Sequence, residues 1–279
     1  MSNTIDWGKI HYSSWSPETN LTGSGGVDSD AQAFITAASI TDSTQQSAIN
    51  TLVTDLKAYG VWTKMKAIYP FVGGTATSHK FNLKDPQATD SAFRLVFNGG
   101  WTHSVNGATP NGTNGYANTY FNPTAQSLST TSQHLSYYSR TNVAQNAVEI
   151  GVISGTNNNF LGLYVSSTFG TRTSLASSGR YNYTPSPIDT RGLFTSSRIN
   201  GTDIKVYING SIQDTQAISS TGNDNFNMYI GTYGAASGQT LWSTKECAFA
   251  SIGDGLTDTE AANLYTTVQA FNTTLSRNV

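Results

Sequence analysis

The sequence predicts a mainly β protein, an antiparallel sandwich or barrel with helices near both ends of the chain. Three observations support this prediction. From about residue 61 onward, apolar residues alternate with polar ones in short runs, as they do in half-buried strands. Turn-forming dipeptides such as Asn-Gly and Gly-Gly separate these runs. No helical segment lies between the runs, which favours antiparallel pairing over a parallel sheet with helical crossovers.

The first 27 residues form an irregular N-terminal arm in this interpretation. They show no periodicity and end in the Gly- and Ser-rich stretch 20–26, which is typical of a flexible linker. They also lack the charged and then apolar layout of a signal peptide. The arm carries Tyr12 and Trp15, and exposed aromatic residues often dock on a partner. We therefore take these two as candidate anchoring residues, with packing on their own domain as an equal alternative.

A helical segment is expected over residues 28–60. Asp28 and Asp30 open its first helix, because acidic residues are favoured at the positive end of a helix. Their spacing could also begin a calcium loop, but no further ligand follows at the next alternate position. Thr41 or Asp42 caps the second helix. That helix has an apolar stripe at helical spacing, made by Ile49, Leu52, Val53, Leu56 and Tyr59.

Residues 61–279 are expected to form the β-sandwich, closed by a helix. The alternating runs are 64–71, 93–97, 147–153, 160–165, 204–208 and 226–230. Asn209-Gly210 predicts a tight hairpin, because a type I′ turn needs positive φ at both central residues. Thr257 and Glu260 have the spacing of a capping box. The helix that follows carries the apolar stripe Leu264, Val268 and Phe271.

Composition excludes several classes of protein. Of the 279 residues only 11% are charged, and the formal net charge is −2. These values exclude a nucleic-acid-binding basic module, an acidic tail and a charge-rich helical bundle. No apolar run approaches the roughly 20 residues that a membrane-spanning helix needs, so we expect no membrane insertion. The single cysteine, Cys247, excludes an intramolecular disulfide framework and is expected to be a small buried residue.

Catalytic and metal-binding patterns are missing from the sequence. Glycoside cleavage needs two carboxylates beside one cleft, and the glutamates lie far apart at Glu18, Glu149, Glu246 and Glu260. Acids distant in sequence can still meet in space, so a glycan-cleaving enzyme stays as a minor alternative. The histidines are scattered at His11, His79, His103 and His134. Residues 223–225 read as an ordinary Asn/Asp turn, with calcium ligation as the alternative. We predict no catalytic residue, metal or cofactor.

The stretch 98–123 is the strongest candidate for a binding site. It reads as a long Gly-rich loop, and long loops in compact domains are often functional. Aromatic ring faces stack on the apolar face of a sugar, while Asn and Thr bond its hydroxyls without desolvating a charge. The candidate glycan-binding residues are Trp101, His103, Tyr116, Tyr120 and Phe121. In the alternative interpretation, Trp101 and Tyr120 close the edge of the sandwich. We expect Trp62 and Trp242 to pack against the rest of the domain. In the alternative, Trp242 lies at the sandwich mouth, the open end between the two sheets.

The last 90 or so residues resemble the second half of a concanavalin A-like (laminin-G-like) jelly roll. A strand that ends in Tyr207–Gly210, a strand with Ile230 and Gly231, and a last strand that leads into a capped helix carry this resemblance. It implies a jelly-roll sandwich with an N-terminal helical segment and a C-terminal helix.

A second resemblance covers most of residues 28–276. The block 28–86, the stretch 99–123 and the tail 264–277 look like tailed-phage virion proteins that carry such a jelly roll. The resemblance implies a non-enzymatic head fibre, capsid decoration or tail appendage, located in the virion after assembly in the bacterial cytoplasm. Implied partners are other virion proteins bound through the arm, host-surface polysaccharide and further copies of the chain. A non-viral carbohydrate-binding module is the main alternative.

Overall fold

The computed structural model describes residues 26–153, 157–163, 170–183, 189–236 and 238–279. The candidate anchoring residues Tyr12 and Trp15 lie outside this part of the chain. The helices are α1 (Ser29–Ala37), α2 (Ser43–Ala58), α3 (Ala76–His79) and α4 (Asp258–Thr274), and two single 3₁₀ turns span Trp62–Lys64 and Asp90–Ala92. Within the described residues, no helix combines the length and apolar character that crossing a bilayer requires.

Two antiparallel sheets make up the body. The first contains β1 (Met65–Tyr69), β3 (Trp101–Ser104), β4 (Gly107–Pro110), β6 (Gln133–Ser139), β11 (Gly192–Arg198), β12 (Asp203–Ile208), β13 (Ser211–Ala217) and β15 (Cys247–Gly253). Its order is β13-β12-β11-β6-β15-β4-β3, and β1 also pairs with β15.

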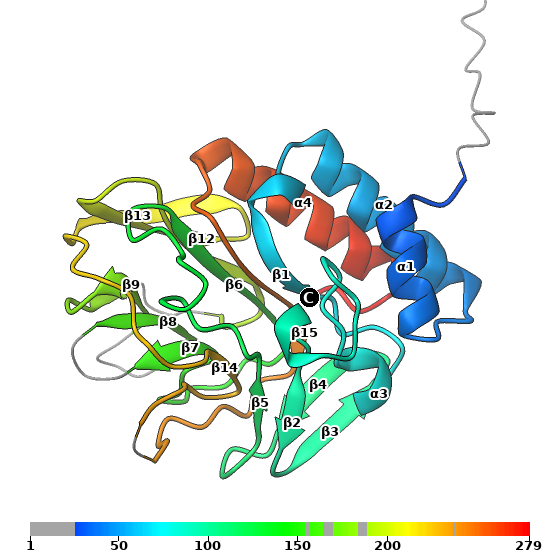
Figure 1. Ribbon diagram of the computed structural model, residues 1–279, viewed down its shortest axis with the longest axis horizontal. Coiled ribbons are helices and arrows are strands. Elements are labelled where there is room, and N and C mark those ends of the chain that lie inside the picture. The colour runs from blue at the N-terminus through cyan, green and yellow to red at the C-terminus, as the bar shows by residue number, and fades with distance from the viewer. Residues whose placement is uncertain (1–25, 154–156, 164–169, 184–188, 237) are drawn as a thin grey trace, which may run out of the picture.

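The second sheet faces the first. It contains β2 (Val96–Asn98), β5 (Tyr116–Asn118), β7 (Ile150–Ile153), β8 (Asn158–Leu163), β9 (Thr171–Ser177), β10 (Tyr181–Tyr183) and β14 (Tyr229–Ile230), in the order β10-β9-β8-β7-β14-β5-β2. Figure 1 shows the sandwich with α1, α2 and α4 gathered on one side. The predicted mainly β jelly-roll sandwich with N-terminal helices and a C-terminal helix is therefore confirmed.

The helix starts follow the local sequence signals. The Asp28 carboxylate caps α1 by accepting a hydrogen bond from the Asp30 N–H at 2.9 Å, and Asp42 caps α2 by accepting from the Gln45 N–H at 2.8 Å. Lys57 of α2 forms ion pairs with Asp28 and Asp30 at 2.7 Å and 2.6 Å. The two aspartates are thus helix-start acids that also hold the two helices together. The capping box that opens α4 is present as predicted.

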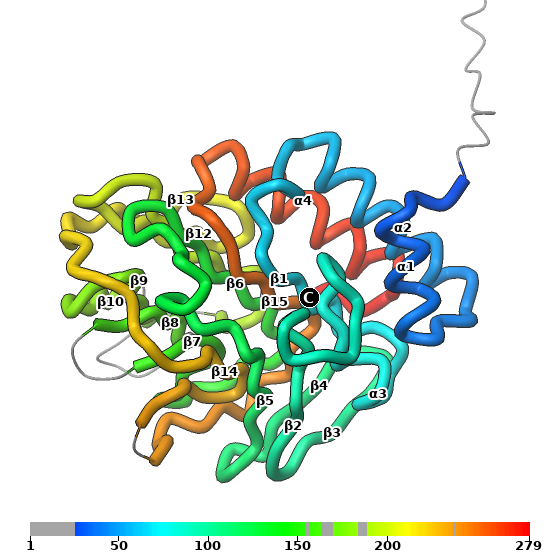
Figure 2. The backbone as a smooth tube through the Cα atoms, in the orientation of Figure 1, coloured from blue at the N-terminus to red at the C-terminus, as the bar shows by residue number. Residues whose placement is uncertain are grey.

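Two buried clusters stabilise the molecule. One lies between the helices and the first sheet, where Leu52 of α2 and Leu264 of α4 pack with Phe249 of β15. Figure 2 shows α2 and α4 side by side although they come from opposite ends of the chain. The other cluster fills the space between the sheets and includes Tyr137 and Ile150. The middle strand β15 contributes to both clusters, so the helices and the sandwich share one central strand.

The β12–β13 hairpin confirms the predicted type I′ turn. Asn209 and Gly210 have φ values of 50° and 72°, and the Asn209 Oδ1 accepts a hydrogen bond from the Leu193 N–H at 2.9 Å. A Cβ on Gly210 would lie 2.8 Å from the Tyr265 Cβ of α4. Glycine is needed there both for the backbone conformation and for the close approach of the helix.

The structure differs from the sequence prediction over 93–123. Phe93 has a φ of 59° and ends a 3₁₀ turn, so the strand begins only at Val96. The stretch 98–123 is not an open loop, because it contains β3, β4 and β5. These strands are short and their residues do not alternate between apolar and polar. β3 and β4 form a local hairpin, but β4 also pairs with β15 and β5 with β14, each more than a hundred residues away, so local sequence could not reveal how they join the sheets. The run 226–230 is likewise mostly irregular, with only Tyr229–Ile230 in a strand.

Aromatic side chains close both sides of the sandwich. On one side the Tyr183 hydroxyl of β10 donates to Gln213 Oε1 of β13 at 3.1 Å, and Tyr181 bonds Asp214 in the same way. On the other side the rings of Phe97 and Trp101 meet edge to face at 5.2 Å. Each contact joins the edge strand of one sheet to the edge strand of the other.

Candidate functional site: an aromatic surface on a buried polar network

The structure divides the predicted binding residues among three places. Tyr116 and Tyr120 lie together with Tyr229 of β14 and Trp242 of the irregular segment before β15. Trp101 and His103 belong to a neighbouring aromatic cluster on β3. Phe121 is 1% exposed and packs against Phe93 at a ring distance of 4.9 Å. Its inclusion among surface-binding residues was wrong, because the chain turns inward there and places the ring in the core.

Tyr116, Tyr120, Tyr229 and Trp242 form a partly exposed surface that we call the tyrosine–tryptophan face. Strands β5 and β14 are paired, which stacks the Tyr116 and Tyr229 rings at 4.7 Å and 24°. The Trp242 ring lies 6.3 Å from Tyr116. Burial, followed by the nearby Tyr116 and Tyr120, raises the pKa of the Tyr229 hydroxyl. The face thus presents adjoining uncharged rings and hydroxyl groups.

An Asn-rich loop holds Tyr116 in place. The Asn111 Oδ1 accepts hydrogen bonds from the backbone N–H groups of Asn114 and Gly115 at 3.0 Å and 2.9 Å. The loop also lies tightly against the segment that carries Trp242, since a Cβ on Gly112 would lie 2.4 Å from the Thr244 side chain. Asn111 and Asn114 remain exposed. The loop therefore brings amide side chains to the border of the aromatic surface.

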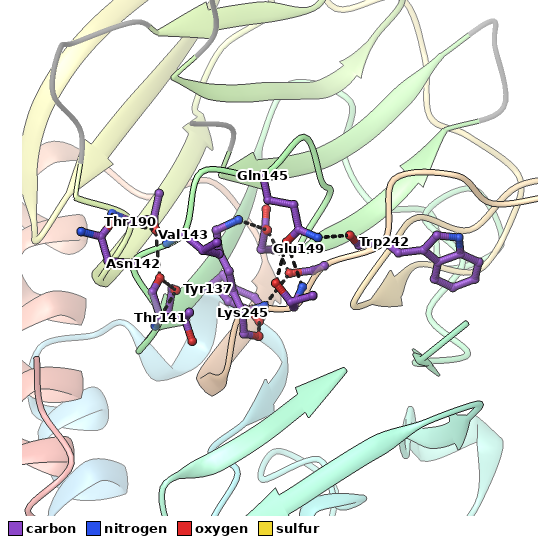
Figure 3. Close-up of polar contacts among 12 residues, drawn as sticks. Tyr137, Thr141, Asn142, Val143, Gln145, Glu149, Thr190, Trp242 and Lys245 are labelled. Carbon is purple, nitrogen blue, oxygen red and sulfur yellow. Dashed lines mark hydrogen bonds and ion pairs between the residues drawn. The ribbon is translucent and has the colours of Figure 1, made fainter. Parts of the chain in front are cut away.

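Gln145 fixes the backbone beneath Trp242. Its Nε2 donates to the Trp242 carbonyl at 2.9 Å, and its Oε1 accepts from the Thr244 N–H at 3.0 Å and from the Thr244 hydroxyl at 2.9 Å. Figure 3 shows the Trp242 indole pointing away from these contacts. Its main chain is held rigidly while the ring stays free to contact a ligand. Trp242 is partly exposed, between the expected packing and the alternative position at the sandwich mouth, and Trp62, at 9% exposure, is buried as expected.

A buried ion pair lies behind this segment. The Lys245 Nζ is 3.2 Å from Glu149 Oε1, and both side chains are 0% exposed. The Ser243 hydroxyl donates to the same carboxylate oxygen at 3.1 Å. Backbone bonding extends the connection, because the Gly231 N–H donates to the Glu149 carbonyl at 2.9 Å. The pair thereby joins the strand that carries Tyr229 to the segment that carries Trp242 (Figure 3).

Sequence reasoning did not identify this pair. The one sequence feature that could have indicated the pair is the position of Glu149 between two apolar residues, Val148 and Ile150, which are both 0% exposed. A carboxylate inside such a run needs a buried partner. The partner lies 96 residues further along the chain, and no local pattern points to it.

Trp101 and His103 lie beside the face. The edge of the Trp101 indole is 3.1 Å from the position that a Cβ on Gly231 would take. The indole Nε1 is buried and has no hydrogen-bond partner among the described residues. The His103 ring meets Phe97 edge-on at 4.6 Å. Trp101 is partly exposed, as Trp242 is, but its indole N–H is turned away from solvent.

His103 also contacts a buried histidine. Its Nδ1 is 2.9 Å from Nδ1 of His79, and the Gly74 N–H donates to His79 Nε2 at 3.2 Å. Since His79 Nε2 accepts, the neutral ring carries its proton on Nδ1 and donates it to His103. Burial, together with nearby His103 and Arg277, lowers the pKa of His79 to about 3. Across the described residues, no three His, Cys, Asp or Glu side chains gather as a metal site.

We expect the protein to lose stability as the pH falls from 7 to 5. Burial holds the pKa of His79 at about 3 and that of His134 at about 4, below the unfolded value of about 6.5. As the pH falls, the histidines of the unfolded chain take up protons at about pH 6.5, whereas those of the folded chain stay neutral until about pH 4 or 3. The free energy of unfolding is therefore highest above pH 6.5 and decreases as the pH falls below that value. At pH 5 the loss is about 2 kcal/mol for each histidine.

Urea unfolding across this pH range measures the effect. The variant His79→Gln should have the shallower pH profile, because one of the histidines whose pKa burial lowers is removed. An unfolding free energy that does not change between pH 7 and pH 5 would contradict the assignment.

Comparison with known proteins gives a likeness of fold. No protein-family model matches the chain, and no curated protein matches its sequence. A mutant sialidase of Trypanosoma rangeli displaying trans-sialidase activity aligns over 81% of this chain and 39% of its own, with a TM-score of 0.54 and 11% identity. This chain has the same fold as part of that protein. The alignment spans well under half of the sialidase chain.

Two further structures are similar at lower TM-scores. Domain 4 of an extracellular arabinanase from Geobacillus stearothermophilus, solved with arabinotriose, covers 72% of this chain and 98% of its own, with a TM-score of 0.42 and 16% identity. A structure of botulinum neurotoxin type C, whose cell entry depends on two ganglioside molecules, covers 76% of this chain and 53% of its own, with a TM-score of 0.49 and 14% identity.

Proposed function

We propose that this protein binds uncharged glycan through the tyrosine–tryptophan face and does not cleave it. The observation that carries this proposal is the group of adjoining, partly exposed rings of Tyr116, Tyr229 and Trp242 on a rigid backing. Rings of this kind stack on the apolar face of a pyranose. Asn114 at the border supplies its side-chain NH₂ group for the sugar hydroxyls, since its Oδ1 and the Asn111 amide already bond within the loop.

The positions of two carboxylates support a binding role over catalysis. General acid–base chemistry requires a carboxyl group that can reach the substrate. Glu149 lies near the face but is buried against Lys245. Glu246 pairs with Arg140 at 2.6 Å. Neither carboxylate is available to a sugar on the tyrosine–tryptophan face.

We expect Trp242→Ala and Tyr116→Ala each to lower glycan affinity about five- to thirtyfold. Each loses stacking and apolar contact worth about 1–2 kcal/mol, and 1.4 kcal/mol is a factor of ten. A glycan array identifies the ligand, and calorimetry then compares the variants. Tyr59→Ala is the matched control, because Tyr59 is 45% exposed at the end of α2. Unchanged affinity in both face variants, with folding intact, would refute this site.

We further propose that the chain is a structural protein of a phage particle, a head fibre, capsid decoration or tail appendage. The sequence resemblance to tailed-phage virion proteins supports this role. Residues 1–27 would join it to other virion proteins, and the sandwich, in more than one copy, would hold host-surface polysaccharide. A non-viral carbohydrate-binding module would use the same face.

The two biological settings predict different results. In the virion role, mass spectrometry of purified particles detects this chain at a fixed ratio to the capsid protein. Deleting residues 1–25 should leave the body folded, because both buried clusters lie downstream, yet abolish incorporation. Absence of the chain from particles would favour the non-viral module.

A further inference from the structure

A cavity of about 470 Å³ opens between the start of β1 and the two segments 82–93 and 121–129. This volume is within the roughly 300–1,000 Å³ of small-molecule sites. The residues that line it are Met65, Lys66, Asn82, Lys84, Asp85, Phe93, Phe121, Gln126, Ser127, Leu128, Ser129 and Asp254. The cavity shares none of its lining residues with the tyrosine–tryptophan face.

Apolar groups form one part of the lining. The Phe93 and Phe121 rings meet edge to face at 4.9 Å, and Met65 and Leu128 are buried beside them. Phe93 adopts a φ of 59°, which is costly for an aromatic residue. The Tyr69 hydroxyl holds it there by donating to the Phe93 carbonyl at 2.7 Å. Strained residues that the surroundings hold in place are typical of functional sites.

The 121–129 segment is also held in place from outside. The Thr124 hydroxyl donates to the Asp224 carbonyl at 2.7 Å, and the Asn223 side chain donates to the Leu128 carbonyl. Asn223 and Asp224 therefore position this side of the cavity. The cavity is formed before any ligand arrives, which lowers the entropic cost of binding.

Charges along the lining compensate each other. Lys66 and Asp254 form an ion pair at 2.9 Å. The Lys84 Nζ donates to the Trp62 carbonyl at 3.1 Å and lies 3.9 Å from the centre of the Trp62 ring. With Asp85 the lining holds two cations and two anions, so its formal charge sums to zero, which favours a neutral ligand. Gln126, Ser127 and Ser129 are exposed and add amide and hydroxyl groups.

We propose that this cavity is a second binding site, for a neutral sugar residue. The partly exposed Phe93 ring suits the C–H face of a sugar, and the balanced charges, amides and hydroxyls suit its vicinal hydroxyls. Tyr120 lies on the tyrosine–tryptophan face, and the next residue, Phe121, lines the cavity. The chain thus has two sugar-binding positions, and the second does not depend on the first.

Nuclear magnetic resonance on the ¹⁵N-labelled chain tests the proposal. The probes are the methyl glycosides of glucose, galactose, mannose and N-acetylglucosamine, with methyl glucuronide as the charged counterpart. We expect at least one neutral glycoside to shift the amide signals of Gln126, Ser127 and Ser129. No shift with any neutral glycoside, or tighter binding of the glucuronide, would overturn the proposal.

Matched variants locate the binding. Gln126→Trp places an indole at the cavity and should weaken binding tenfold or more. Ala125→Trp puts the same ring on the neighbouring exposed residue, which does not line the cavity, and should leave affinity unchanged. Trp242→Ala should also leave these shifts unchanged, which separates this site from the tyrosine–tryptophan face. Equal loss in Gln126→Trp and Ala125→Trp would place the ligand elsewhere and refute the assignment.

Discussion

Replacing Lys245 with Met is expected to lower the free energy of unfolding by about 3–5 kcal/mol. Lys245 and Glu149 are both 0% exposed, and their charged atoms lie 3.2 Å apart. The variant would leave the Glu149 carboxylate in the core without its cation. Hydrogen bonds such as that from Ser243 do not replace the attraction of the Lys245 cation. Urea unfolding followed by circular dichroism measures the loss.

A double variant tests the physical reason. Replacing a buried pair by apolar residues of similar volume is often neutral or stabilising, so Lys245→Met with Glu149→Leu should recover much of the lost stability. The matched control is Lys205→Met, because the Lys205–Asp258 pair is solvent-exposed on one side and worth at most about 1 kcal/mol. If the double variant is no more stable than Lys245→Met, uncompensated charge is not the cause.

Replacing Arg277 with Met should destabilise the protein by a similar amount, about 3–5 kcal/mol. The guanidinium is 0% exposed. Its Nη2 donates to the carbonyls of Pro70 and Ala248 at 2.7 Å and 2.9 Å, and its Nη1 donates to the Phe71 carbonyl at 2.7 Å. The variant leaves these three buried carbonyls without this donor. Each unsatisfied group costs about 1–3 kcal/mol.

Arg277 also supports a strained position. Phe71 has a φ of 45°, and the arginine bonds its carbonyl. Arg277→Lys should recover little, because an ammonium cannot reproduce the planar array of donors. Arg191→Met is the control, since Arg191 is 48% exposed and pairs with Asp189 on the surface. Thermal unfolding of the three variants provides the comparison, and an Arg277→Lys variant as stable as the original protein would contradict this account.

The tyrosine–tryptophan face that we propose for binding was only partly predictable from the sequence. Tyr116 and Tyr120 were candidates because their Asn- and Gly-rich surroundings match a general chemistry for sugars. Tyr229 was not identified as a binding residue, because it belongs to an irregular stretch whose pairing with β5 no local pattern reveals. The outward position of Trp242 depends on Gln145, nearly a hundred residues away in the chain. Phe121 shows the reverse error, since its sequence surroundings resemble those of the surface residues while its ring is buried.

The sequence by itself determined the features that depend on near neighbours. Asp28 and Asp42 cap their helices, Thr257 opens the last helix, and Asn209-Gly210 forms the predicted turn. Each of these is a contact within a few residues, so short-range sterics and hydrogen bonding decide it. Only the tertiary structure decided which aromatic rings meet, which charges are buried together and where a cavity opens. These depend on pairings across about a hundred residues, whose free energy comes from desolvation and packing that exist only once both sheets have formed.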